Sequence, residues 1–241
     1  MIGATFKPSL IAIAVAAVSG LAASPAMADW TGKGQAGAVI ASGNTESKAG
    51  NVKLSLTDAY DAWKHDFGFD AVYASDATGT TAQRFQIAEQ SNYKFDAHNF
   101  VYGGLRYEQD HFSGFKDQAI VSAGVGHQFI DTDATKLSGQ VGLGYKRSET
   151  RTPSTTTSAL AYLGAVDFKH AFNASTSIFD KLTVEATSGN TFAENDIGVE
   201  VKMSDRLALA VGYAVRNNTD PPPAFKKTDT LTTLNIVYQF K

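Results

Sequence analysis

The chain contains no cysteine, and only six of its 241 residues are proline. Without cysteine there is no disulfide framework, no thiolate metal site and no cysteine nucleophile. Beyond residue 28, proline is confined to Pro153 and the run at 221–223. No segment beyond residue 28 reaches 18 consecutive apolar residues, so no transmembrane helix is expected there. Because proline cannot donate to a strand ladder, its scarcity suits a chain with many strands.

An excess of basic charge is also lacking. The chain has 21 basic and 24 acidic residues, which give a formal net charge of −3 at pH 7. Nucleic-acid-binding domains usually present a strongly basic surface. We therefore expect no nucleic-acid partner.

The first 28 residues have the pattern of a secretory signal peptide. Lys7 precedes an apolar run at 10–18, and the segment ends in Ala26-Met27-Ala28, an A-x-A cleavage pattern. The apolar run is shorter than the ~20 residues of a spanning helix. We expect cleavage after Ala28 and one mature domain at 29–241; the alternative is an uncleaved anchor.

Beyond residue 29 the hydrophobic pattern has a period of two. Leu207, Leu209 and Val211 share one face, whereas Ala208 and Ala210 share the other. No window of comparable length has a period of 3.6, so the pattern predicts an all-β protein. We predict twelve strands, centred near Gly37, Leu54, Phe69, Ile87, Gly104, Ala123, Val141, Gly164, Thr183, Val199, Ala210 and Ile236. The ninth has the weakest pattern, because Asp180 interrupts its apolar face.

The predicted connections alternate in length. Those after even-numbered strands are short, as at 96–98, 131–133, 173–175 and 204–206. Those after odd-numbered strands are longer and polar, at 42–47, 75–81, 110–117, 148–158, 188–195 and 217–229. Short periplasmic turns, longer outer loops and an even strand number are typical of bacterial outer-membrane barrels. The tetrapeptide Ser-Gly-Asn-Thr, at 42–45 and 188–191, falls at the loop end both times.

A soluble β-sandwich is the alternative, because its strands also alternate, with the apolar face packed in a core. Aromatic residues at both strand ends favour two membrane interfaces instead. They are Trp30, Trp63, Tyr93, Phe95, Phe100, Phe168 and Phe172 at the turn end and Tyr73, Phe85, Tyr107, Phe112, Tyr145 and Tyr213 at the loop end. We therefore predict a single 12-stranded antiparallel up-and-down transmembrane β-barrel in the outer membrane of a Gram-negative bacterium, with both termini on the periplasmic side.

The last predicted strand suggests how the chain reaches that membrane. Apolar or aromatic residues occupy alternate positions up to Tyr238 and Phe240, which resembles the signal read by the barrel assembly machinery. Lys241 departs from the usual aromatic terminus. The other expected partners are outer-membrane lipid and lipopolysaccharide. Lys226 and Lys227 are candidates to contact lipopolysaccharide, unless they belong to an ordinary solvated loop.

Several loose motifs resemble a known family. SGNTES at 42–47, YEQDHFSG at 107–114, AGVGH at 123–127 and VGLGY at 141–145 resemble a bacterial family of salt-induced outer-membrane proteins of unknown function. The resemblance covers essentially the whole mature chain. It implies an outer-membrane β-barrel and a link to osmotic or salt stress, but no established activity and no functional residues.

The alternation places charges of both signs on the interior face. The candidate lumen-lining residues are Lys53, Asp70, Arg84, Arg106, Glu108, Lys146, Glu185, Glu200, Lys202 and Arg216. Such a lumen either conducts or binds a small solute, or is sealed by charges that pair across it. Twelve strands lie between the filled eight-stranded barrels and the 16–18-stranded porins. The sequence thus predicts a narrow passive channel or a structural envelope protein.

The rival function is enzymatic. His111 and Ser113 resemble the His-x-Ser arrangement of the outer-membrane phospholipase, in which histidine takes the serine proton. No nearby residue offers itself as the orienting third group. The five histidines do not have a metal-binding spacing, and no cofactor motif occurs, so neither metal nor cofactor is expected.

One charge fits the barrel pattern badly. Glu89 falls among the outward residues Phe85, Ile87, Ser91 and Tyr93, near the middle of its strand. Charge on a lipid-facing surface is unfavourable. A bulge that shifts the register, a contact with another protomer or a locally wrong face assignment would each explain it.

Overall fold

The computed structural model describes residues 30–42, 47–76, 79–110, 113–151 and 153–240. The predicted signal peptide and His111 lie outside these residues. The strands are β1 (Thr31–Ser42), β2 (Ser47–Tyr60), β3 (Trp63–Asp76), β4 (Gly79–Lys94), β5 (Asn99–Asp110), β6 (Phe115–Asp131), β7 (Thr135–Thr150), β8 (Thr156–Ala171), β9 (Thr176–Thr187), β10 (Thr191–Lys202), β11 (Leu207–Asn218) and β12 (Thr228–Phe240). Among the described residues, no helix has the length and hydrophobicity needed to cross a membrane.

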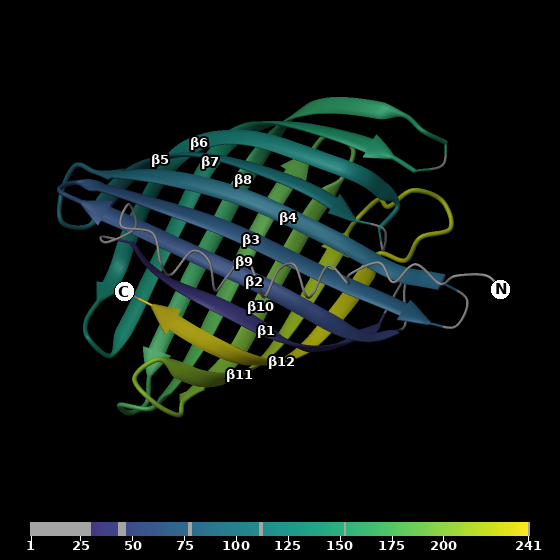
Figure 1. Cartoon of the computed structure of the whole chain (residues 1–241). Helices are drawn as coiled ribbons and strands as arrows, with labels where there is room; N and C mark the ends of the chain where they lie inside the picture. The colour runs from purple at the N-terminus through teal and green to yellow at the C-terminus, as the bar shows by residue number, and fades with distance from the viewer. Residues whose placement is uncertain (1–29, 43–46, 77–78, 111–112, 152, 241) are drawn as a thin grey trace.

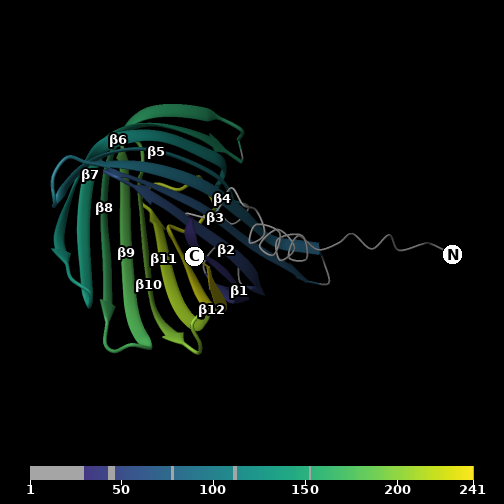
Figure 2. The same cartoon turned by 60° about the vertical axis from the view of Figure 1, so that its left-hand side comes forward.

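The twelve strands form one closed barrel in which each strand pairs with its neighbours in the sequence (Figures 1 and 2). The seam is an antiparallel pairing of β1 with β12 that runs from Gly32 opposite Phe240 to Ser42 opposite Thr230. Closure satisfies both sheet edges, which matters in hydrocarbon because each unpaired backbone group there costs several kcal/mol. The prediction of a 12-stranded antiparallel barrel is confirmed, and all twelve predicted centres fall inside strands.

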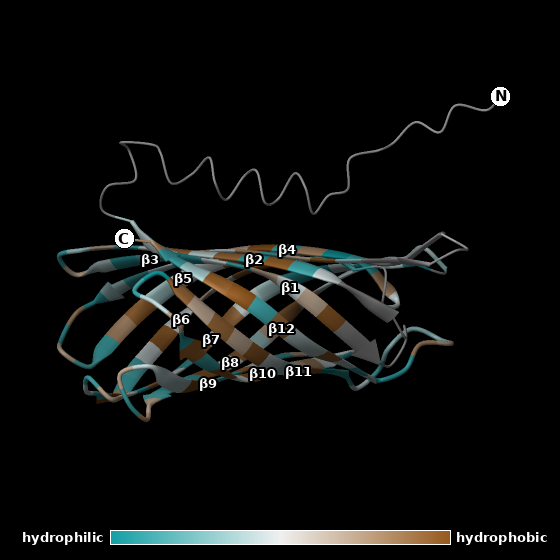
Figure 3. Cartoon of the chain, turned by 60° about the horizontal axis from the view of Figure 1, so that its bottom comes forward, coloured by the Kyte–Doolittle hydropathy of each residue, from teal (hydrophilic) through white to brown (hydrophobic). Residues whose placement is uncertain are grey.

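The large apolar side chains point outward. Val141, Leu209 and Ile236 keep 62%, 38% and 59% of their surface exposed, although they lie in the middle of strands. Gly34 on β1 pairs with the outward-pointing Tyr238 on β12 and with Leu54 on β2. Register partners point to the same face, so Leu54 also lies on the outer face. Apolar and polar residues alternate along the strands (Figure 3). An apolar exterior around a polar interior is the reverse of a β-sandwich and is typical of a membrane-spanning barrel.

The connections alternate between the two ends of the barrel, but the predicted difference in length is mostly wrong. The predicted loop 75–81 is short, because β3 ends at Asp76 and β4 begins at Gly79, whereas 219–227 is clearly longer than the turns. The turns at 61–62, 95–98, 132–134, 172–175 and 203–206 lie at one end, called here the turn end, and the other connections at the loop end. The predicted loop 188–195 is wrong in length, because β10 begins at Thr191 and leaves three connecting residues. The side chain of Thr187 bonds Asn190 across this short turn. The second Ser-Gly-Asn-Thr is therefore a tight turn at the loop end; the first lies largely outside the described residues.

The predicted aromatic belts are wrong at Phe100. At the turn end Trp63 and Tyr93 face outward and pack with ring centroids 5.0 Å apart, and at the loop end Phe85 and Tyr107 do so at 5.9 Å. Phe100, however, points into the barrel, where it packs against Gly126 and lines the cavity described below. Its register partner Gly126 has no side chain, so the ring has room inside. Phe112 lies outside the described residues.

Glu89 faces outward in an uninterrupted register, opposite Phe67 and Leu105. Neither a bulge nor a wrong face assignment explains it. Its carboxylate accepts a hydrogen bond of 2.6 Å from the Ser91 hydroxyl, which also bonds His65 Nδ1 at 2.7 Å. The outward Asp180 is similarly paired, with the Asn195 side-chain amide at 2.5 Å. Local polar partners thus accompany both acids on the apolar exterior.

The turn between β4 and β5 provides a test of stability. The Asp96 carboxylate accepts hydrogen bonds from the Asn99 side chain and from the backbone N–H groups of His98 and Asn99, and these bonds hold its pKa below the usual range. Because the folded pKa is lowered, the stabilisation is present above the unfolded pKa of about 4 and is lost as pH falls through the folded pKa. We expect Asp96→Ala to lower the urea midpoint of unfolding at pH 7, and the difference from wild type to shrink below pH 4. A difference that is equal at pH 7 and pH 3 would contradict this.

Candidate functional site

The register places every candidate lumen-lining residue on the inner face of the barrel. Five of them, Lys53, Asp70, Arg84, Arg106 and Glu185, line a cavity inside the barrel. Glu108, Lys146 and Arg216 lie in a buried layer at the loop end. Glu200 and Lys202 lie towards the turn end of β10. The ten residues thus occupy different levels of one lumen.

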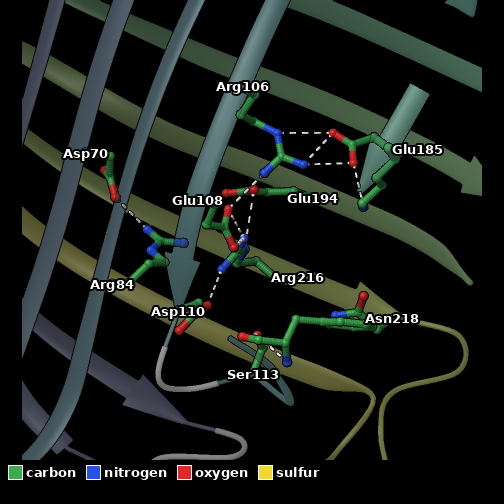
Figure 4. A network of polar contacts seen from close by, with 12 residues as sticks. Asp70, Arg84, Arg106, Glu108, Asp110, Ser113, Glu185, Glu194, Arg216 and Asn218 are labelled. Atoms are coloured by element: carbon green, nitrogen blue, oxygen red, sulfur yellow. Dashed lines mark hydrogen bonds and ion pairs between the residues drawn. The ribbon is translucent and has the colours of Figure 1, made fainter. Parts of the chain in front are cut away.

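Arg216 forms ion pairs that cross the full width of the lumen. Arg216 on β11 donates to Glu108 on β5 at 2.7 and 2.8 Å, and to Asp110 at 2.8 Å (Figure 4). In the closed order, β5 and β11 lie on opposite sides of the barrel, with five strands between them in either direction. A direct side-chain contact between these strands therefore spans the full width of the lumen. Glu108 is only 2% exposed, so water has little access at this level.

A second set of ion pairs completes this layer. Arg106 donates to both oxygens of Glu185 at 2.6 and 2.8 Å, and Lys146 donates to the same carboxylate at 2.7 Å. Arg106 also reaches Glu108 at 2.9 Å, which connects the two sets. We call these five residues, Arg106, Glu108, Lys146, Glu185 and Arg216, the loop-end network. Bidentate arginine–carboxylate pairs have a fixed geometry, so the network holds its side chains in place.

An aromatic ring lies beside the network. Phe192, which is 4% exposed, has the charged ends of Arg216, Arg106 and Lys146 at 5.1, 5.7 and 5.4 Å from its ring centroid. Cations within about 6 Å of an aromatic face are attracted to its electron density. The ring therefore fills the space between the cations without adding charge.

Loops cover the outer side of the network. Arg151 donates from its backbone N–H to the Gly114 carbonyl at 2.9 Å and from Nη2 to the Asp110 carbonyl at 3.0 Å. A Cβ added to Gly114 would lie 2.6 Å from the Pro222 ring, so the two loops are already in close contact. The proline-containing loop 219–227 therefore packs on its neighbours at the mouth.

On the turn side of the network the lumen is hollow. The cavity has a volume of about 810 Å³ and extends from Arg106, Glu185 and Phe192 down to turn-end residues such as Lys94 and His98. Its wall includes buried polar atoms without a hydrogen-bond partner: Asn51 Oδ1, Arg84 Nε, Tyr102 OH and Asn235 Oδ1. These atoms are enclosed in the wall and have almost no accessible surface, so the cavity is lined instead by the exposed parts of the polar and charged side chains. The barrel is thus filled at one end and hollow at the other.

Two ion pairs mark the middle of the cavity. Arg84 donates to Asp70 at 2.7 Å on the adjacent strand, and Lys53 reaches across from β2 to Asp196 on β10 at 3.0 Å. The Lys53 and Asp196 side chains keep 37% and 26% of their surface exposed, in contrast to the network. Solvent therefore reaches this level of the lumen.

In the described residues, the hydroxyl of Ser113 bonds the backbone. Its buried Oγ donates to the Phe115 carbonyl at 3.2 Å and accepts from the Phe115 backbone N–H at 3.3 Å. In the described residues, no titratable side chain bonds this hydroxyl, and His111 lies outside them. The geometry gives the enzymatic alternative no support, because a nucleophile needs a base within hydrogen-bond reach.

Sequence reasoning missed part of the site. Glu194, whose carboxylate lies 3.4 Å from Arg216 Nε, and Asp110 were assigned to loops, and Phe192 was overlooked for the same reason. All three would have appeared on the inner face had β10 and β5 been extended by the period of two. For Asn51 and Asn235, the alternation indicates the inner face, and nothing else in the sequence marks them as part of the cavity wall.

Comparisons with known proteins agree with this architecture. The chain is 23% identical over 216 residues to the uncharacterized protein YdiY of Escherichia coli (strain K12), covering 87% of this chain and 82% of YdiY. The NanC porin structure superposes with a TM-score of 0.59 at 10% identity, over 87% of this chain and 100% of NanC. The COG4313 outer-membrane channel of Pseudomonas putida F1 gives 0.51 at 9% identity, over 87% and 95%. At such identities the two structures show a shared fold only.

A family match covers nearly all of the described barrel. It extends over residues 34–240, and the family is described as a protein of unknown function, DUF481. This agrees with the resemblance drawn from the Gly-rich and aromatic motifs, which likewise implied a family without an established activity. The chain therefore belongs to the DUF481 family.

Proposed function

We propose that this protein is a narrow passive channel of the bacterial outer membrane, restricted at its outer end by the loop-end network. The observation that carries this proposal is the Arg216–Glu108 pair, which crosses the whole lumen above a hollow of about 810 Å³. A purely structural barrel has no need of such a hollow, whereas in a channel the hollow would form most of the ion path and the network a short restriction in it.

Orientation and targeting belong to the same proposal. The short turns would lie on the periplasmic side and the loops outside, as in other outer-membrane barrels. The apolar exterior and the terminal Tyr238 and Phe240 support lipid as the surroundings and the barrel assembly machinery as the assembly partner. Contact of Lys226 and Lys227 with lipopolysaccharide and a role in osmotic or salt stress remain predictions from the sequence.

Planar-bilayer recordings of the refolded mature chain test the proposal. We expect single-channel steps well below those of an open trimeric porin, because the ion path narrows at the network. A protein that inserts, as shown by a heat-shifted band in electrophoresis, yet gives no steps at any voltage would instead be a sealed envelope protein. The interlocked loops and paired charges favour that second candidate.

A further inference from the structure

The charges of the inner wall are segregated along the barrel axis. The middle carries the paired Lys53, Arg84, Asp70 and Asp196, which balance one another. The loop half carries the cations Arg106, Lys146 and Arg216 and the acids Glu108, Asp110, Glu185, Glu194 and Asp229. The turn half carries Lys33, Lys64, Lys94, Lys136, Lys169, Lys181 and Lys202 and the acids Asp66, Asp131, Asp167 and Glu200. Acids are therefore in excess near the loops and lysines near the turns. We call the turn-half charges and the space between them the turn-end vestibule.

Ion pairing leaves the lysine excess uncompensated. Lys33 pairs with Glu200 at 2.6 Å, Lys64 with Asp66 at 2.8 Å and Lys136 with Asp131 at 2.6 Å. Within the described part of the chain, the remaining four lysines of the vestibule have no carboxylate within 4.0 Å: Lys94, Lys169, Lys181 and Lys202. Two acids lie opposite Lys181 in the register: Asp167, which is left over, and Asp196, which is paired with Lys53. The vestibule thus holds more free positive than free negative charge.

These lysines act on one another across the lumen. Lys169 on β8 lies near enough to Lys33 on β1, to Lys202 and Glu200 on β10 and to Asp167 for their charges to act on it. A cleft lined mainly by one sign of charge, with walls of low dielectric constant, concentrates counter-ions. Lysine suits this role, because its ammonium is hydrated and mobile, whereas the arginines of the network are locked in bidentate pairs.

The vestibule leads into the cavity inside the barrel. Lys94 and Lys181 belong to both, and the amide side chains of Gln86, Gln90 and Gln140 line the cavity further along. A solute that carries acidic groups together with hydroxyl groups would find ammonium partners first and amide partners beyond them. The volume of about 810 Å³ admits such a molecule.

We propose that the turn-end vestibule binds small organic anions bearing carboxylate or phosphate groups and makes the channel prefer anions. The selectivity part rests on the channel function proposed above, whereas the binding part needs only the folded barrel. The two parts therefore call for separate measurements.

Binding is measured by calorimetry on the refolded mature barrel in detergent at low salt, with citrate and inorganic phosphate as anions and spermidine as the cation. We expect citrate to bind and to be weakened by added NaCl, because salt screens exposed charges. The variant Lys169→Gln/Lys202→Gln should weaken citrate binding by about tenfold. Lys226→Gln/Lys227→Gln is the matched control, since it removes the same charge from the loop end and should leave citrate affinity unchanged.

Selectivity is measured as the reversal potential under a KCl gradient in planar bilayers. We expect chloride to be favoured over potassium by about threefold, and this preference to be lost in Lys169→Gln/Lys202→Gln. Absence of conductance would reject the channel function alone, and the citrate titration would then decide the binding site. Equal citrate affinity in the double variant and wild type, or spermidine binding as tight as citrate, would overturn the inference.

Discussion

Gly37→Ala is expected to prevent most molecules of the protein from closing into a barrel. Gly37 lies on β1 at the seam, opposite Asn235 on β12 and Asn51 on β2. A Cβ there would meet the Leu234 carbonyl oxygen and would lie 2.7 Å from the Asn235 Cα. Because these are backbone atoms of the ladder partner, no side-chain rotation relieves the contact and the strands must separate. Overpacking of this kind costs about 3 kcal/mol, and here it falls on the pairing that removes both sheet edges.

The measurement is refolding from urea into detergent, followed by electrophoresis without heating, in which a closed barrel migrates differently from the unfolded chain. Gly68→Ala is the matched control, because Gly68 also lies within a strand and an added Cβ there meets nothing within 4 Å. It should refold like wild type or slightly better, since alanine suits a strand better than glycine. Equal folded fractions for Gly37→Ala and Gly68→Ala would show that the seam tolerates a side chain.

Arg216→Ala should open the lumen and destabilise the barrel. The substitution removes the group that joins β11 to Glu108 and Asp110 and leaves these buried carboxylates short of a partner. Loss of one member of a buried ion pair costs about 3–5 kcal/mol. Because the same side chain spans the lumen, we expect single-channel conductance to rise several-fold. Urea unfolding and planar-bilayer recording measure the two effects separately.

Arg147→Ala provides the comparison at the same end of the barrel. Arg147 also pairs with acids, Asp117 at 3.0 Å and Glu149 at 3.7 Å, but it lies on the outer face with half of its side chain exposed. Exposed pairs contribute under about 1 kcal/mol, so its loss should change stability little and conductance not at all. Adding Glu108→Gln to Arg216→Ala should recover part of the stability, because one of the two buried carboxylates that lost Arg216 becomes neutral while the lumen stays open. A conductance equal to wild type in Arg216→Ala would show that the network does not limit the ion path.

Much of the barrel could be predicted because a strand has a strict period of two. The alternation of Leu207, Leu209 and Val211 with Ala208 and Ala210 assigns a face to every residue of β11, and the same reasoning holds around the barrel. The predictions fail at strand ends, where too few alternating residues remain to indicate a strand or a face. Thr191 and Phe192 follow a turn motif, which predicts a loop, and Phe100 lies at a strand end, where aromatic rings usually face outward.

By itself, the amino-acid sequence determined the number of strands, their order, and which side chains meet lipid and which meet the lumen, because these depend on local periodicity and connection length. Only the tertiary structure decided that Arg216 meets Glu108, which is 108 residues earlier, and that the lumen is filled at the loop-end network and hollow from there to the turn end. Which side chains meet across a barrel depends on the tilt and register of all twelve strands together. A local sequence pattern contains no information on this combined geometry.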